Sequence, residues 1–421
     1  MIKLKTTGCV QKLIAQTYDG ASVMASSLNG VQAKVKSFAP MAIFTHCYAH
    51  KLNLVLAKST DNIQQCKIFF KSIEGLSAFF GRSTKRTRIL DDVVKQRIPR
   101  VSTVRWNSKS RLVQTILVHL FDLIKLFRMI SDNEIDNLDG ETISMAKGHL
   151  MFLTKSSNFF LLFLFDSIFN RTDNLFNIFQ KKINDIKYCV DHVNQTLTAL
   201  GQERNDFDKF FRAYEEKASS LTSSADTRRE QNTTTLRVLY VEIYDNVISQ
   251  MEFRFANVEE LSFFGLLDRP KNAVVSKKPD EKILDQLLLQ YPSIFDHVRL
   301  RADLIGFYSS DAMQNKTHSE LLDFIIQNDL KETVPEVCKL LDLILTIPAT
   351  TASVERSFSA LKRIKNFYRS SMLQERLSSL GIISIEKKRL LHLKDTDSNG
   401  FYDAVIGEFT KKDRRMEFTY R

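Results

Sequence analysis

Two acidic side chains in this sequence stand where a metal-dependent reaction would need them. Asp19 follows a strand-like run and precedes Gly20, and a carboxylate fixed at a strand end is well placed to hold Mg²⁺. Glu355 lies in the first turn of a helix expected after Pro348. Each acid also has a purely structural interpretation, because Asp-Gly is a common turn pair and an acid in a first turn complements the helix dipole.

A second group of polar residues lies in the segment FTHCYAHKLNL, which supplies His46, Cys47 and His50. Cys47 and His50 are three residues apart and therefore share one face of a helix. A structural zinc site needs four ligands, and no second pair lies nearby. Packing and hydrogen bonding are therefore the favoured interpretation of this motif.

Positive charge is densest in residues 82–111, which contain ten Lys or Arg against two Asp, a net charge of +8. Such density suits contact with the phosphates of a nucleic acid. Trp106 adds a flat ring on which a base could stack. The alternative is a solvated helical face with a buried indole. The basic candidates for DNA contact are Arg82, Lys85, Arg86, Arg88 and Arg105.

Composition sets the wider limits. The 421 residues are 43% hydrophobic and carry a net charge of +11, which suits a polyanionic partner but is moderate for this length. Five cysteines, odd in number and widely spread, do not form a disulfide framework and favour a reducing compartment. The apolar run at 159–165 ends at Asp166, so no membrane span is predicted.

Three textures follow one another along the chain. Residues 1–60 read as strand, helix, strand and helix, and 61–330 read as nearly all helix because apolar residues recur at three- and four-residue spacing. The fold class predicted is therefore α+β, mainly α. Beyond 331, a helix ends at Pro348 and two more follow. The last helix carries an apolar stripe that suits either an intrachain core or a partner surface, namely Leu373, Leu377, Leu380 and Ile383.

Three segments together resemble the hAT superfamily of DNA transposases, in particular its group with MYM-type zinc-finger relatives. They begin AQTYDGASVMASS, PRVSTVRWNSKSRLV and LTIPATTASVERSFS, and the last resembles the hAT C-terminal dimerisation region. The resemblance implies an RNase H-like core interrupted by a long all-helical insertion domain. The domains would be a partial core at 1–60, the insertion at 61–330, a dimerisation region completing the core at 331–391, and a basic tail at 392–421.

The resemblance also implies roles for single residues. The family binds divalent metal with an Asp, Asp, Glu set, in which Asp19 matches the second acid and Glu355 the third. Cys47 and His50 match the Cys-x-x-His of the family. Its Arg-Trp pair, which in relatives lies near the transposon end and a flipped base, corresponds to Arg105 and Trp106.

The chain departs from the family pattern at its beginning. In the family, strands carrying the first catalytic Asp precede the strand before Asp19, whereas the eighteen residues here contain no Asp or Glu. No paired ligands of a zinc finger precede His46 either. We therefore expect an incomplete core, either a truncated copy or a shortened derivative. No cofactor is expected for this chain, and Mg²⁺ would be needed only if the core were complete.

Three functions are compatible with these observations. An active transposase would perform Mg²⁺-dependent strand cleavage and transfer. The favoured hypothesis is a nuclear, non-enzymatic, transposase-derived protein that forms a homodimer or higher homo-oligomer through Leu373, Leu377 and Leu380, with DNA as a candidate partner. The third is a structural helical adaptor. No membrane and no small-molecule substrate is expected among the partners.

Overall fold

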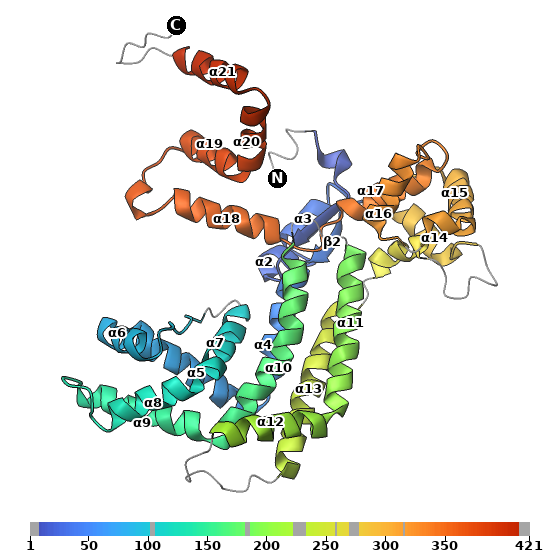
Figure 1. Cartoon of the computed structure of the whole chain (residues 1–421). Coiled ribbons are helices and arrows are strands. Elements are labelled where there is room, and N and C mark those ends of the chain that lie inside the picture. Colours follow the sequence, from blue (N-terminus) through green and yellow to red (C-terminus); the bar gives the residue numbers. More distant parts are fainter. Residues whose placement is uncertain are drawn as a thin grey trace. The chain divides into compact units, whose positions relative to one another are not determined.

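The computed structural model describes residues 8–101, 106–181, 186–221, 233–256, 259–268, 278–314 and 316–411. The described residues are mainly helical with one two-stranded sheet, which confirms the predicted α+β, mainly α class (Figure 1). The chain divides into two compact units, Met1–Thr351 and Ala352–Arg421. The domain boundaries expected from the sequence stay a prediction.

The sheet lies near the start of the larger unit. Strands β1 (Ala15–Tyr18) and β2 (Ile43–His46) pair in parallel, in register from Ala15 opposite Ile43 to Tyr18 opposite His46. The chain crosses between them through the short helices α2 (Ser22–Ala25) and α3 (Val31–Lys36) and passes from β2 into α4 (Tyr48–Thr60). This is the predicted strand, helix, strand, helix order, and both strands end at the same edge of the sheet.

The remaining elements of the larger unit are helices. Three short 3-10 helices are η1 (Val10–Lys12), η2 (Glu259–Leu267) and η3 (Asp311–Met313). The α-helices after α4 are α5 (Gln64–Gly81), α6 (Thr84–Val93), α7 (Asn107–Val118), α8 (Leu120–Ser131), α9 (Gly140–Thr154), α10 (Ser156–Phe179), α11 (Ile186–Asn205), α12 (Phe207–Leu221), α13 (Thr233–Phe255), α14 (Glu281–Gln290), α15 (His297–Ser309), α16 (His318–Gln327) and α17 (Pro335–Thr346).

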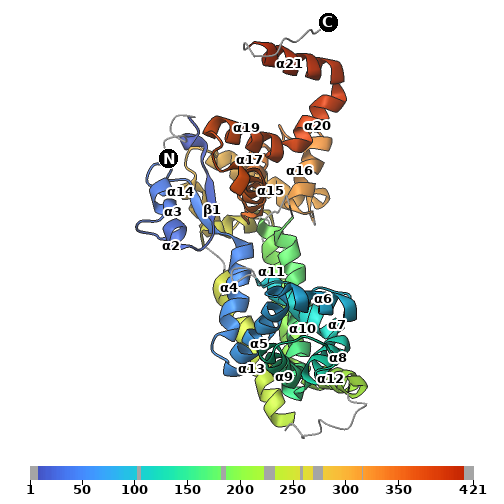
Figure 2. The same ribbon diagram turned by 90° about the vertical axis from the view of Figure 1, so that its left-hand side faces the viewer.

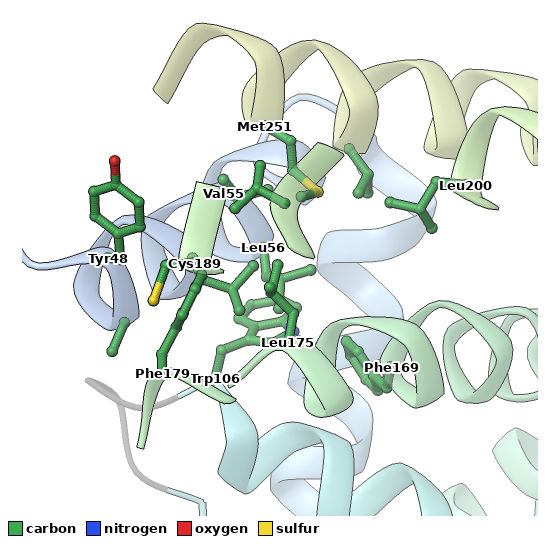
Figure 3. Close-up of a cluster of buried hydrophobic side chains, with 14 of the residues drawn as sticks. Tyr48, Val55, Leu56, Trp106, Phe169, Leu175, Phe179, Cys189, Leu200 and Met251 are labelled. Carbon is green, nitrogen blue, oxygen red and sulfur yellow. The ribbon is translucent and has the colours of Figure 1, made fainter. Parts of the chain in front are cut away.

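A bundle of α4, α10, α11 and α13 forms the centre of this unit (Figures 1 and 2). Their apolar faces meet in one buried cluster, in which Leu56 of α4, Phe179 of α10 and Met251 of α13 come together (Figure 3). The bundle is continuous with the helix that follows β2, so the strand edge is held on the same core.

Helix α10 explains the apolar run noticed in the sequence, because Phe160, Leu164 and Phe165 are all fully or almost fully buried. No single helix of the described residues is long and apolar enough to cross a membrane. Only α9 and α10 taken together reach that length and composition, and they are bent by 68° where they join.

The smaller unit is a chain of helices with little interior of its own. It comprises α18 (Ala352–Ile364), the 3-10 helix η4 (Phe367–Arg369), α19 (Gln374–Ile385), α20 (Lys387–Thr396) and α21 (Ser398–Thr410). Each helix packs on the next, yet α19, α20 and α21 contain no buried residue. The exposed large apolar side chains are Val354, Phe358, Leu361, Phe367, Leu373, Ile382, Ile383, Ile385, Leu391, Leu393, Tyr402, Val405 and Phe409.

Candidate functional site

The segment after α17 is held against the two strands by threonine side chains. Thr17 of β1 donates its hydroxyl to the Pro348 carbonyl at 2.7 Å, and the Thr45 hydroxyl of β2 reaches the same oxygen at 3.3 Å. The two hydroxyls also contact each other. A residue more than 300 positions away is thereby fixed beside the sheet.

Cys47 continues this attachment at the end of β2. It is fully buried, its backbone N–H donates to the Tyr18 carbonyl at 2.9 Å, and its Sγ accepts from the Thr351 N–H and hydroxyl at 3.3 and 3.2 Å. The next N–H, of Tyr48, donates to the Ala349 carbonyl at 3.0 Å. Cys47 is therefore a hydrogen-bonded packing residue at the start of α4, and Glu355 follows four residues after its partner Thr351.

Replacing Thr17 and Thr45 together by valine is expected to destabilise the larger unit by about 1–3 kcal/mol, because the Pro348 carbonyl loses both hydroxyl donors. Denaturant unfolding followed by circular dichroism measures the change. Thr198→Val is the matched control, since that exposed hydroxyl bonds only the Asn194 carbonyl of its own helix. A double variant as stable as the control variant would contradict the attachment.

Asp19 lies where β1 ends and is exposed. Its carboxylate accepts from the Ala21 N–H at 3.3 Å, as in a turn that leads into α2. Gly20 fits closely against the neighbouring histidine, since a Cβ there would lie 2.6 Å from the His46 ring. No side chain other than hydrogen fits at Gly20 without displacing that ring.

His46 ends β2 beside Asp19 and has an unusual environment. Burial lowers its pKa to about 4, repulsion from His50, Lys51 and Arg254 adds to the shift, and Asp19 opposes it. The His46 and His50 rings lie 5.4 Å apart. The buried Nε2 of His46 has no hydrogen-bond partner among the described residues. The histidine is therefore neutral near pH 7, with a polar atom left unused.

The lowered pKa of His46 predicts a stability that depends on pH. The unfolded histidine protonates near its ordinary pKa of 6.5 and the folded one near 4, so between these values the unfolded state binds more protons and stability falls as pH falls. The contribution amounts to roughly 1–3 kcal/mol. His46→Gln should flatten the stability curve in this window relative to the unaltered chain. Parallel curves for the two proteins would show that His46 does not titrate as described.

The metal set implied by the resemblance is not assembled by the described residues. No group of three or more His, Cys, Asp or Glu side chains that could hold a metal ion occurs in the described ranges. Asp19 belongs to the larger unit and Glu355 to α18 of the smaller one. These two acids do not make a Mg²⁺ site by themselves, and we assign no catalytic step to them.

The predicted DNA contacts on α6 have different surroundings. Lys85 donates to the Asn137 carbonyl, and the Arg86 guanidinium lies 4.4 Å from the centre of the Phe79 ring and reaches the Thr142 hydroxyl at 3.5 Å. Both side chains therefore hold α6 to its neighbours. Arg82 and Arg88 are exposed and remain available to a partner.

Of the predicted Arg-Trp pair, Arg105 lies outside the described residues. Trp106 is only 6% exposed and packs edge-on against Phe70 at 5.0 Å and Phe169 at 5.9 Å. Its backbone N–H donates to Asn53 Oδ1 of α4 at 3.2 Å. The buried-indole alternative describes this position, so a stacking role would require the ring to leave its core contacts.

Lys51 and Arg254 were not among the residues selected from the sequence, yet both border His46. Lys51 is 8% exposed and lies on the buried side of α4. A signal was present for Lys51, because it stands three residues after Tyr48 and four before Val55, on the face that the helix buries. Arg254 ends α13 after a long polar and apolar mixture and gives no comparable signal.

The predicted dimerisation residues lie on α19 and at its start. Leu373 is 79% exposed, whereas Leu377 and Leu380 are half-buried. The side chains of Ile382 and Ile385, farther along the same helix, are 62% and 54% exposed. Residues 305–388, from α15 into α20, match the hAT family C-terminal dimerisation region. This match supports an origin of the chain in the hAT family, with self-association through its C-terminal part.

Proposed function

We propose that this transposase-derived protein works as a homodimer or higher homo-oligomer in the nucleus, holding DNA on a basic surface without cutting it. The observation that carries the proposal is the smaller unit, in which α19, α20 and α21 bury no side chain although they are rich in large apolar residues. Exposed apolar surface of this extent marks an interaction site.

A second copy of the chain is the proposed occupant of that surface. Residues 305–388 match a dimerisation region, and this range includes all of α18 and α19 with the start of α20. A two-fold interface uses the same patch on both copies, so apolar side chains on one face can cover each other. Ile382 and Ile385 extend the surface that the sequence had suggested through Leu373.

DNA is the proposed second partner, supported by the net charge of +11 and by the exposed Arg82 and Arg88. Reversing both charges to glutamate should weaken binding to a short duplex and reduce the steepness of its salt dependence by about two phosphate contacts. Lys125→Glu with Lys147→Glu, two exposed lysines outside residues 82–111, is the matched control. Equal losses in both double variants would show that α6 is no special contact, and no salt-dependent binding by any form would leave only the adaptor hypothesis.

The absence of cleavage is part of the proposal and is tested separately. Supercoiled plasmid incubated with the protein and Mg²⁺ or Mn²⁺ should stay intact. Nicking that is lost in both Asp19→Asn and Glu355→Gln would contradict this and establish the alternative, a fragment of an active hAT transposase that performs Mg²⁺-dependent strand cleavage and transfer. Because only activity tied to those two residues counts, a contaminating nuclease does not decide the result.

A further inference from the structure

Positively charged and imidazole groups gather at the edge of the sheet where β2 passes into α4. Lys51 Nζ lies 5.0 Å from the centre of the Tyr48 ring and 5.7 Å from that of Phe255, the last residue of α13. Arg254 precedes Phe255 and repels both Lys51 and His46. Two cationic side chains and a histidine from three elements thus share one small region.

This region contains more hydrogen-bonding capacity than the protein uses. His46 Nε2 and Arg254 Nε are buried without a partner, and the ammonium of Lys51 has only ring contacts and no carboxylate in ion-pair distance among the described residues. Burial lowers the pKa of Lys51 to about 8, and repulsion from Arg254 contributes. Buried cations are normally paired, so the cluster lacks an anion.

We propose that His46, Lys51 and Arg254 form a binding site for a phosphate group, and that its occupant is a backbone phosphate of DNA. A phosphate accepts hydrogen bonds from all three side chains and offsets the charge that they bury. Asp19, the carboxylate acting on His46, is exposed and accepts from Ala21, so it leaves Lys51 and Arg254 uncompensated.

The surroundings favour a nucleic-acid phosphate over a free one. The basic stretch 82–111 returns to α4 through Trp106, whose N–H bonds Asn53 two residues beyond Lys51. Gly20 keeps the edge low, because any side chain there would meet the His46 ring. This inference rests on DNA as the proposed partner, but the phosphate site itself is tested without DNA.

The first arm of the test uses inorganic phosphate as the probe. Thermal unfolding of the full chain is compared in sodium phosphate and in sodium chloride at matched ionic strength. Phosphate should raise the midpoint of the unaltered protein, of Lys51→Arg and of the control Lys147→Met, an exposed lysine on α9. It should not raise the midpoint of Lys51→Met. An equal shift in Lys51→Met and Lys147→Met, or no shift in any form, would overturn the site.

The second arm measures affinity for a short DNA duplex over a range of salt concentrations. Lys51→Met should bind roughly tenfold more weakly, which corresponds to one charge-assisted hydrogen bond, and should show a salt slope smaller by about one. Lys147→Met should match the unaltered chain. A phosphate effect lost in Lys51→Met with unchanged DNA binding would support the site and reject DNA as its occupant. Failure of every form to bind DNA would instead reject the proposed function.

Discussion

Replacing Ile382 and Ile385 by aspartate is expected to convert the self-associated protein to a monomer. Both side chains are more than half exposed on α19, inside the range that matches the dimerisation region. Four like charges brought together at a two-fold contact, in place of four apolar side chains, should weaken association at least a hundredfold, about 3 kcal/mol or more. Sedimentation velocity measures the change in mass.

The matched control places the same charges on the same helix. Ser379→Asp with Ser384→Asp alters two exposed polar positions of α19 and leaves every apolar side chain in place. This variant should still associate. Leu377→Asp with Leu380→Asp tests the half-buried positions predicted from the sequence and should also dissociate the protein. Association retained in the Ile382 and Ile385 variant would move the interface away from this part of α19.

Replacing Trp106 by alanine is expected to cost about 3–5 kcal/mol of stability, the usual range for emptying a buried aromatic site. The indole packs against Phe70 and Phe169, and the Lys109 ammonium lies 4.5 Å from the ring centre. Trp106→Phe retains a ring and should cost less. Denaturant unfolding measures both changes.

The control for Trp106 is Val118→Ala at the end of the same helix, a 70% exposed side chain whose loss should change stability by about 0.5 kcal/mol or less. DNA binding is measured in parallel on the folded proteins. Full stability of Trp106→Ala together with loss of DNA binding would show that the indole acts as a stacking platform and not as a core residue.

The order of elements could be read from the sequence because local patterns determine it. Alternating residues before Asp19 and the apolar spacing beyond residue 61 correspond to β1 and to the helical body. Asp19 at the strand end and Cys47 at the start of α4 were likewise placed correctly along the chain. These features depend on residues that are near neighbours in sequence.

Contacts between distant residues could not be read in the same way. Nothing in the sequence pairs Thr17 with Pro348 or Lys51 with Arg254, since both contacts depend on how the helical body returns to the sheet. Charge density was also a poor guide to exposure. Arg86 stacks on Phe79 within the protein, although its sequence neighbours Arg82 and Arg88 are exposed.

The most direct test of the account is the solution mass of the full chain, measured by sedimentation equilibrium over a wide range of protein concentration. We predict a species of at least twice the chain mass of 48.6 kDa that dissociates only on dilution. A single species of 48.6 kDa at every concentration would contradict self-association through the C-terminal unit.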